Sequence, residues 1–139
     1  MPIKIGMAAA GALFIEKQLL IIRRSPSSKI DPHKWEIPKG KVRSSEDQRE
    51  ALKREVLEEI GLDVLIDENP LFSRSFTLLG FQIRLYVYLI HSLKLDPEIQ
   101  LSHEHVDHTW ITDDEISEFD FATGIEGVVR RLFRDYLPS

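Results

Sequence analysis

Short apolar runs recur along this chain, and polar or turn-forming residues separate them. Residues 8–15 and 19–24 are two such runs, and the polar tripeptide Glu16-Lys17-Gln18 between them has the length of a hairpin turn. In residues 85–90 both alternating sets of positions are apolar or aromatic, which is typical of a strand covered on its two faces. The pattern predicts further strands at residues 35–37, 62–66, 71–79, 82–91 and 106–111.

Three segments have the features of helices. Ser45 is an N-cap residue type, Gln48 three positions later completes a capping box, and Gly61 is suited to end the helix. We therefore expect a helix from Ser45 to Ile60, a short one at residues 113–119 and a longer one at 124–136. Strands mixed with a few helices predict an α/β sandwich with a mixed β-sheet. No linker or repeat divides residues 1–139, which we interpret as a single domain.

Composition narrows the class of protein without giving its function. The chain has 139 residues, of which 42% are hydrophobic, no cysteine and a formal net charge of −5. The charge argues against stable nucleic-acid binding, and no apolar run approaches the ~20 residues of a membrane span. Residues 1–6 lack the pattern of a signal peptide. We expect a cytoplasmic protein that binds neither nucleic acid nor membrane, although metal ions or a local basic patch could still neutralise a small anionic substrate.

The expected helix at residues 45–60 carries a group of neighbouring carboxylates. On a helical wheel at about 100° per residue, the stripe that should enter the core consists of Leu52, Val56 and Ile60. Glu55, Glu58 and Glu59 share the flank beside this stripe. Such like charges repel by roughly 0.2–0.5 kcal/mol per pair, and the helix dipole disfavours them near a C-terminal end. Either this flank is a solvated acidic face, or it binds hard divalent cations such as Mg²⁺.

The spacing of residues 40–62 distinguishes the two readings. The segment reads Gly, five residues, Glu, seven residues, Arg-Glu-aliphatic-x-Glu-Glu-x-Gly-aliphatic, which is the Nudix box. Its defined positions are Gly40, Glu46, Arg54, Glu55, Val56, Glu58, Glu59, Gly61 and Leu62. The chain therefore resembles the Nudix hydrolase family, and its MutT-type members in particular. The resemblance implies a Nudix-type α/β/α sandwich and a hydrolase that cleaves a phosphoanhydride bond in a nucleoside-diphosphate-linked substrate with Mg²⁺ or Mn²⁺.

The resemblance also implies a set of metal ligands. They are the carboxylates of Glu55, Glu58 and Glu59 and the backbone carbonyl of Lys39. Many Nudix enzymes carry a further glutamate six residues before a tryptophan, and Glu104 and Trp110 have this spacing. Glu104 is thus expected to be an additional ligand or the general base, and Glu55 is the other candidate for the base.

Four other positions in the box have implied supporting roles. Glu46 and Arg54 are expected to tie the loop to the helix, and Arg54 could also orient the neighbouring Glu55 carboxylate. Gly40 and Gly61 supply backbone freedom at the loop and at the helix exit.

Basic residues near the box are candidates for binding substrate phosphates. Arg23 and Arg24 end a strand, so their side chains should point to opposite faces and only one can reach a site. Ordinary solvated charges are the alternative for both. Lys39 and Lys41 can meet phosphate oxygens as point charges. Trp35 is expected to anchor the core or a loop rather than to stack on a base.

Residues 102–110 hold three histidines, and this segment can be interpreted in two ways that imply different metals. His103, His105 and His108 could form a zinc site, because imidazole suits zinc. So short and polar a loop is an unusual place for such a site. We favour Glu104 as the functional residue, with Asp107 and the three histidines as loop residues.

The chain also departs from the family's pattern. Arg43 stands where many relatives have an acidic residue, and Ser45 where they often have glycine. Residues 121–125 contain no asparagine like the one that reads oxidised guanine in the MutT type. The residues available near the last helix to enclose a base are Phe119, Phe121, Thr123 and Ile125.

The resemblance implies a nucleoside triphosphate pyrophosphohydrolase of the MutT type that releases a monophosphate and pyrophosphate. Hydrolysis of ADP-ribose or of a dinucleoside polyphosphate is an alternative activity, and a catalytically silent nucleotide-binding domain is another. The intact box argues against a silent domain. The expected partner is a small nucleotide, and the chain is expected to act as a monomer or homodimer.

Overall fold

A computed structural model describes residues 5–138 of the chain; residues 1–4, on which the signal-peptide prediction largely depends, and residue 139 lie outside the described residues. The strands are β1 (Ile5–Ile15), β2 (Gln18–Arg24), β3 (Trp35–Glu36), β4 (Lys39–Lys41), β5 (Val64–Ile66), β6 (Phe72–Leu78), β7 (Phe81–Ser92) and β8 (His105–Ile111). The helices are α1 (Gln48–Ile60), the 3-10 helix η1 (Asp113–Glu118) and α2 (Ile125–Tyr136). Among these, none is long and apolar enough to cross a membrane.

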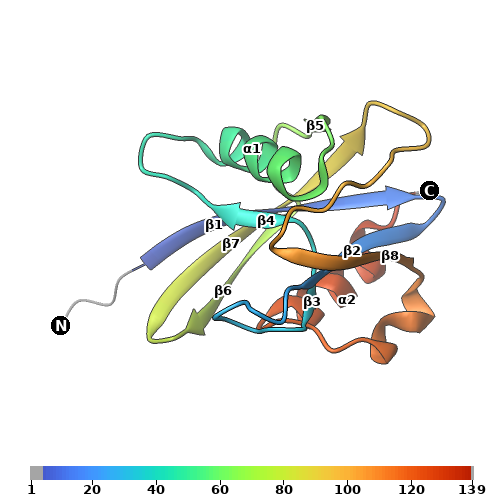
Figure 1. Ribbon diagram of the computed structural model, residues 1–139. Coiled ribbons are helices and arrows are strands. Elements are labelled where there is room, and N and C mark those ends of the chain that lie inside the picture. Colours follow the sequence, from blue (N-terminus) through green and yellow to red (C-terminus); the bar gives the residue numbers. More distant parts are fainter. Residues whose placement is uncertain (1–4, 139) are drawn as a thin grey trace.

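β1 is the central strand of a mixed sheet whose order is β3-β2-β1-β7-β5. It runs parallel to β7, and antiparallel to β4 at residues 8–10 and to β2 at the hairpin. β5 and β6 both pair with β7, and β8 pairs with β2 (Figure 1). Parallel and antiparallel pairs in one sheet confirm the mixed sheet that the sequence predicted.

α1 and α2 cover opposite faces of the sheet (Figure 1). Ala9 and Leu13 of β1 pack in the cluster that also buries the predicted stripe of α1, namely Leu52, Val56 and Ile60. Ala10 and Ala12 face the other way and pack in the cluster that buries Val128 and Leu132 of α2. The predicted α/β/α sandwich is therefore confirmed.

The predicted N-cap of α1 was wrong by two residues. Asp47, not Ser45, is the N-cap, and its side chain accepts a 2.8 Å hydrogen bond from the backbone N–H of Glu50. Residues 43–46 form a turn instead, with the N–H of Glu46 donating to the carbonyl of Arg43. The end of the helix is as predicted, because Gly61 has a φ of 70° and its N–H donates to the carbonyl of Leu57.

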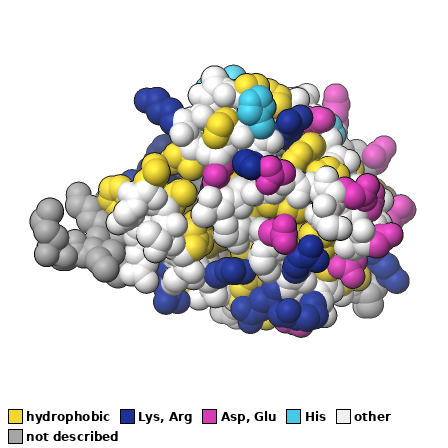
Figure 2. Space-filling view, turned by 90° about the horizontal axis from the view of Figure 1, so that it is seen from below, with side chains coloured by type: hydrophobic (Ala, Val, Ile, Leu, Met, Phe, Trp, Pro, Cys, Tyr) yellow, Lys and Arg dark blue, Asp and Glu magenta, His cyan; other side chains and the backbone are white. Residues whose placement is uncertain are grey.

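Charge is unevenly distributed over the surface. Figure 2 shows many acidic side chains toward the right of one face and several basic side chains along its lower edge, while elsewhere on this face the two kinds lie side by side. Local basic regions thus exist on a chain whose formal net charge is −5. The net charge alone does not prevent this surface from attracting a small anion.

Candidate active site

Two of the three carboxylates of α1 lie directly against the short strand β4. A β-carbon at Gly40 would lie 2.0 Å from Cγ of Glu55, so only glycine leaves room for this side chain. The backbone N–H of Lys39 donates a 3.1 Å hydrogen bond to Oε1 of Glu59. Glu58 is farther out, with 57% of its side chain exposed. The junction of β4 and α1 is therefore lined by carboxylate groups.

Glu59 is the most buried of these groups, with 5% of its surface exposed. Burial, and then the negative charges of Glu36 and Glu55, raise the pKa of Glu59 well above its usual range, against the opposing hydrogen bond and charge of Lys39. An ionised carboxylate in such surroundings is costly unless a cation compensates it. The group therefore fits a hard divalent cation, which would neutralise the charge that the protein leaves uncompensated.

Arg54 joins the loop before α1 to the carboxylates on it. Its Nε and Nη2 donate to the two oxygens of Glu46 at 2.8 and 2.9 Å, and its Nη1 donates to Glu55 at 2.7 Å. The hydrogen bonds from Arg54 hold the pKa of Glu46 at about 2, and the same contacts raise the pKa of Arg54. Glu58 lies 3.7 Å from the same guanidinium. Arg54 thus sets the position of the loop and of the Glu55 carboxylate together.

Within residues 5–138, no three His, Asp or Glu side chains converge as a metal cluster. Arg54 holds Glu55 and approaches Glu58, while Glu59 turns to the backbone of Lys39. The four carboxylates named by the sequence nevertheless offer only oxygen atoms, the donors that Mg²⁺ and Mn²⁺ prefer. Three come from one flank of α1, and Glu104 comes from the segment before β8.

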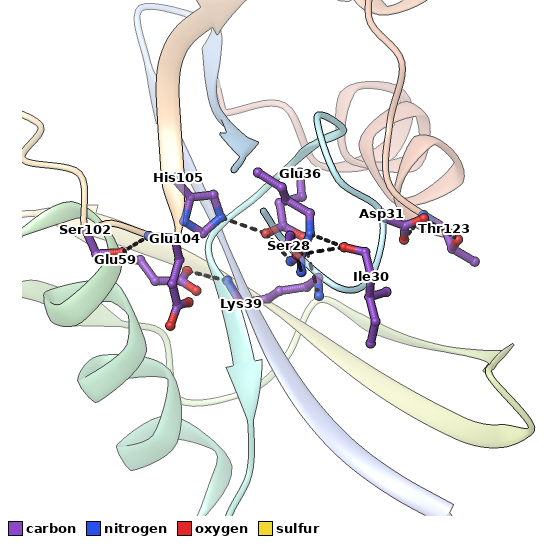
Figure 3. A network of polar contacts seen from close by, with 11 residues as sticks. Ser28, Ile30, Asp31, Glu36, Lys39, Glu59, Ser102, Glu104, His105 and Thr123 are labelled. Carbon is purple, nitrogen blue, oxygen red and sulfur yellow. Dashed lines mark hydrogen bonds and ion pairs between the residues drawn. The ribbon is translucent and has the colours of Figure 1, made fainter. Parts of the chain in front are cut away.

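A buried acid that the sequence reasoning missed lies beside this group. Glu36 on β3 has 1% of its side chain exposed and receives hydrogen bonds from Arg24 at 3.0 Å and His105 at 2.8 Å (Figure 3). Its other oxygen, Oε1, lies 3.4 Å from Nζ of Lys39, an ion pair without hydrogen-bond geometry. Burial opposes ionisation, but Lys39, His105 and Arg24 together lower the pKa of Glu36 to about 2. The sequence does contain a signal that could have revealed Glu36, namely a charged residue between Trp35 and Ile37 in a segment predicted to be extended.

The two arginines at the end of β2 have different surroundings. The guanidinium of Arg24 donates to Glu36, to Oγ of Ser28 and to the carbonyl of Ile30, and so organises the loop after β2. Arg23 donates to the carbonyl of His33. Of the two, Arg24 lines the pocket described next, together with Lys39 and Lys41.

An apolar pocket of about 310 Å³ lies beside β4, and Glu36, Lys39 and Gly40 form part of its wall. Its apolar lining comes mainly from β6 and β7, namely Phe76, Leu78, Ile83 and Leu85. Asp31 and Thr123 add a polar edge, where the N–H and hydroxyl of Thr123 donate to the Asp31 carboxylate. A small pocket with apolar walls and few polar groups is typical of a site for a ring system.

The residues predicted to enclose a base do not all line this pocket. Of the four residues predicted, Thr123 lines the pocket, whereas Phe121 and Ile125 are buried in the core. Phe119 packs edge-on against Trp35 at 5.2 Å between ring centroids, which agrees with Trp35 as an anchor. The other walls of the pocket could not be predicted, because they lie on strands far from residues 119–125 in sequence.

A second, more open cleft of about 1090 Å³ begins at the same strands. Gly6, Met7 and Lys41 line both cavities, so the two spaces adjoin. The cleft continues to Arg43 and Gln48 at the start of α1. A long ligand could therefore extend from the apolar pocket across β4 into this cleft.

The histidine-rich segment is not a uniform loop, which corrects one prediction. His105 is the first residue of β8 and is buried against Glu36, whereas His103 and His108 are exposed. Glu104 is also exposed, and its carbonyl accepts a 2.9 Å hydrogen bond from Ser25. The three histidines do not converge on one point, because His105 turns inward.

The geometry can now be compared with known proteins. A family model described as NUDIX domain matches residues 6–132. The chain belongs to the NUDIX family. The matched residues include the complete Nudix box and the segment that carries Glu104.

Individual relatives agree with this assignment. A protein of Buchnera aphidicola named 8-oxo-dGTP diphosphatase is 30% identical over 120 residues, which is 86% of this chain and 88% of the relative. Nucleoside triphosphatase NudI of Escherichia coli is 24% identical over 119 residues, covering 80% of this chain and 84% of the relative. The crystal structure of a MutT protein from Methanosarcina mazei has the same fold, with a TM-score of 0.80, 24% identity and coverage of 96% and 94% of the two chains. The chain is a Nudix hydrolase, an enzyme that acts on acid anhydrides.

Proposed function

We propose that this Nudix hydrolase is a metal-dependent nucleoside triphosphate pyrophosphohydrolase of the MutT type, which releases a nucleoside monophosphate and pyrophosphate. The observation that carries the proposal is the position of β4, whose Gly40 faces Glu55 of α1 and also lines the apolar pocket. A base held in this pocket would place its phosphates beside the carboxylates. The names of the Buchnera aphidicola and Escherichia coli relatives support the same substrate class.

We assign the cation, Mg²⁺ or Mn²⁺, to the carboxylates of Glu55, Glu58, Glu59 and Glu104 and to the backbone carbonyl of Lys39. The raised pKa and burial of Glu59 support this assignment, because they mark a carboxyl group whose ionisation the protein's own groups do not compensate. When bound, the ion would neutralise phosphate charge and increase the acidity of the attacking water.

The protein's own side chains would perform the remaining tasks. Lys39 and Lys41, together with Arg24 at the pocket wall, would bind phosphate oxygens. Glu55 or Glu104 would accept the proton of the attacking water. Arg54 would hold Glu55 in position through their 2.7 Å hydrogen bond.

A dinucleoside polyphosphate is the second candidate substrate. The open cleft beyond Lys41 adjoins the apolar pocket and offers space for a second nucleoside. Arg43 and Arg49 in this cleft could approach the longer phosphate chain. This substrate would use the same carboxylates and differ only in what occupies the cleft.

A screen of products distinguishes the two candidates. The purified chain is incubated with Mg²⁺ or Mn²⁺ and with nucleoside triphosphates, ADP-ribose or diadenosine polyphosphates, and the products are separated by ion-exchange chromatography. Release of pyrophosphate and a monophosphate from triphosphates supports the proposed function. Hydrolysis confined to diadenosine polyphosphates would contradict it and favour the second candidate. No hydrolysis of any of these compounds would exclude both.

We propose that the protein acts as a monomer or homodimer. The proposed partner is a small nucleotide, and we propose the cytoplasm, where such nucleotides are abundant, as the place of action. Gel filtration with light scattering measures the oligomeric state directly.

A further inference from the structure

β8 begins with a β-bulge. Arg23 pairs with Asp107 and Arg24 with His105, so Val106 is an extra residue on β8. Residues paired across antiparallel strands point to the same face. The bulge therefore places His105 on the face of Arg24, although His105 and Asp107 are two residues apart.

On that face His105 meets Glu36. Glu36 pairs with Ile22 of β2, which shares a face with Arg24, so register alone brings the three polar side chains together. The side chains of His105 and Glu36 are each 1% exposed, and Nε2 of His105 lies 2.8 Å from Oε2 of Glu36. Since an ionised carboxylate only accepts, Nε2–H of His105 is the donor. The imidazole is thus fixed in one orientation.

This buried residue directly follows Glu104. Glu104 lies in the turn that precedes β8, which the N–H of His105 closes by donating to the carbonyl of Ser102 at 3.3 Å, and the residue is exposed. The N–H of Glu104 donates to Oγ of Ser102, and the N–H of Ser102 donates to the carbonyl of Glu59 at 3.1 Å. The Glu104 backbone is therefore two hydrogen bonds from Glu59, and Figure 3 shows its side chain directed to the side where Glu59 lies.

We propose that His105, anchored by Glu36, is a positioning residue that holds the carboxylate of Glu104 beside the carboxylates of α1. The proposal rests on the proposed function, which gives Glu104 its role as metal ligand or general base. The backbone of Glu104 is also held by the buried Ser25, whose N–H donates to the Glu104 carbonyl, and by the half-buried Ser102. The His105–Glu36 pair adds a buried side-chain contact directly after Glu104, and we expect its loss to let this turn shift.

Two polar substitutions of different length separate positioning from simple core filling. In His105→Gln the amide nitrogen reaches the place of Nε2 and keeps the hydrogen bond to Glu36, whereas in His105→Asn it is too short. We expect His105→Asn to lower kcat by roughly 10–100-fold and to weaken Mn²⁺ binding, while His105→Gln stays close to wild type. The readouts are steady-state kinetics and titration of the free protein with Mn²⁺ followed by electron paramagnetic resonance. His108→Asn, at an exposed position on the same strand, is the matched control and should change neither quantity.

A double-variant cycle tests whether His105 acts through Glu104. If it does, Glu104→Gln combined with His105→Asn should be no slower than Glu104→Gln alone. Losses that multiply would overturn the proposal, as would equal losses in the Asn and Gln variants at position 105. Unfolding temperatures of all variants show whether a loss of kcat reflects a weakened fold. The proposal is also overturned if kcat falls together with the unfolding temperature, whether or not the variant keeps the hydrogen bond to Glu36.

Failure of this proposal is distinguishable from failure of the proposed function. If Glu104→Gln leaves kcat and Mn²⁺ binding unchanged, the assigned role of Glu104 is wrong. If Glu104→Gln slows the enzyme but His105→Asn does not, the positioning by His105 is wrong and the proposed function stands.

Discussion

The α-carbon of Gly40 faces the side chain of Glu55 so closely that a β-carbon there would lie 2.0 Å from Glu55 Cγ. Gly40→Ala should therefore push Glu55 out of its place against β4. We expect kcat to fall at least tenfold, because displacement of a catalytic group is known to cause losses of this size. Gly127→Ala is a useful control, because its β-carbon meets only the flexible, exposed guanidinium of Arg74. Kinetics of both variants with Mg²⁺ check this, and a fully active Gly40→Ala would show that Glu55 is not needed where it lies.

Glu58→Gln and Glu59→Gln should each reduce turnover by at least about two orders of magnitude while the fold survives, because each removes a negative ligand from the proposed cation site. Glu50→Gln, exposed near the start of the same helix, should have little effect. Rates are measured at saturating Mg²⁺ and the fold by circular dichroism. Near-normal turnover of either ligand variant would contradict its assignment.

Glu59→Gln should also stabilise the metal-free protein. The pKa of Glu59 is raised in the folded state, so the folded state binds more protons, and ionisation weakens folding as pH rises above the unfolded value of about 4.5. Removing the charge should raise the unfolding temperature by roughly 2–5 °C at pH 8, and by less at pH 5. Thermal unfolding in EDTA measures this, with the exposed Glu58→Gln as the control. An unchanged or lower temperature for Glu59→Gln would mean that the buried carboxylate is already compensated.

Glu104→Gln should lower activity markedly, whereas His103→Ala combined with His108→Ala should not. Both histidines are exposed, whereas the N–H of Glu104 donates to Ser102, whose own N–H donates to the carbonyl of Glu59. Activity assays are accompanied by metal analysis of protein purified without added metal. Stoichiometric zinc that disappears in the double histidine variant would instead support a zinc site in this segment.

Substrate choice should be broad among nucleoside triphosphates and related diphosphates, with kcat/KM values within roughly a hundredfold of each other. The pocket walls are mainly apolar, and the carboxylate of Asp31 already accepts hydrogen bonds from Thr123. Strong rejection of a wrong base requires buried polar groups that it would leave unpaired. A kinetic panel of canonical, oxidised and methylated nucleotides, ADP-ribose and diadenosine polyphosphates decides this. A single substrate preferred by four orders of magnitude would reveal a specific polar contact, with Asp31 as the first residue to test.

The carboxylate flank of α1 could be predicted because it depends on spacing within one helix. The interior stripe and the Gly61 ending follow from helical geometry and local backbone conformation alone. The start of the helix could not be predicted in this way, since Ser45 and Asp47 are both residue types that begin helices, and the turn at Glu46 selects between them. The hydrogen bond between Glu46 and Arg54, which are eight residues apart, favours the start at Asp47.

The Glu36–His105 pair shows a different limit. The two residues are 69 positions apart, and they meet only because β8 has a bulge at Val106. Without that extra residue His105 would share the face of Asp107, as regular alternation suggests. A one-residue irregularity in strand pairing leaves no clear signal in the order of polar and apolar residues. The pocket walls on β6 and β7 were missed for another reason, because they reach Thr123 only through tertiary packing.

The three residues of β4 lie between the carboxylates of α1 and the apolar pocket. Hydrolysis and recognition of the ring can therefore change independently in evolution. The carboxylates lie on its α1 side, whereas Phe76, Leu78 and Ile83 line the pocket from another part of the chain. Mutations on β6 or β7 can thus change which ring the pocket accepts while the carboxylates of α1 stay in place. Duplicated genes could diverge rapidly in preference by this route, and a library for directed evolution of new specificity should randomise these three positions and leave residues 40–62 untouched.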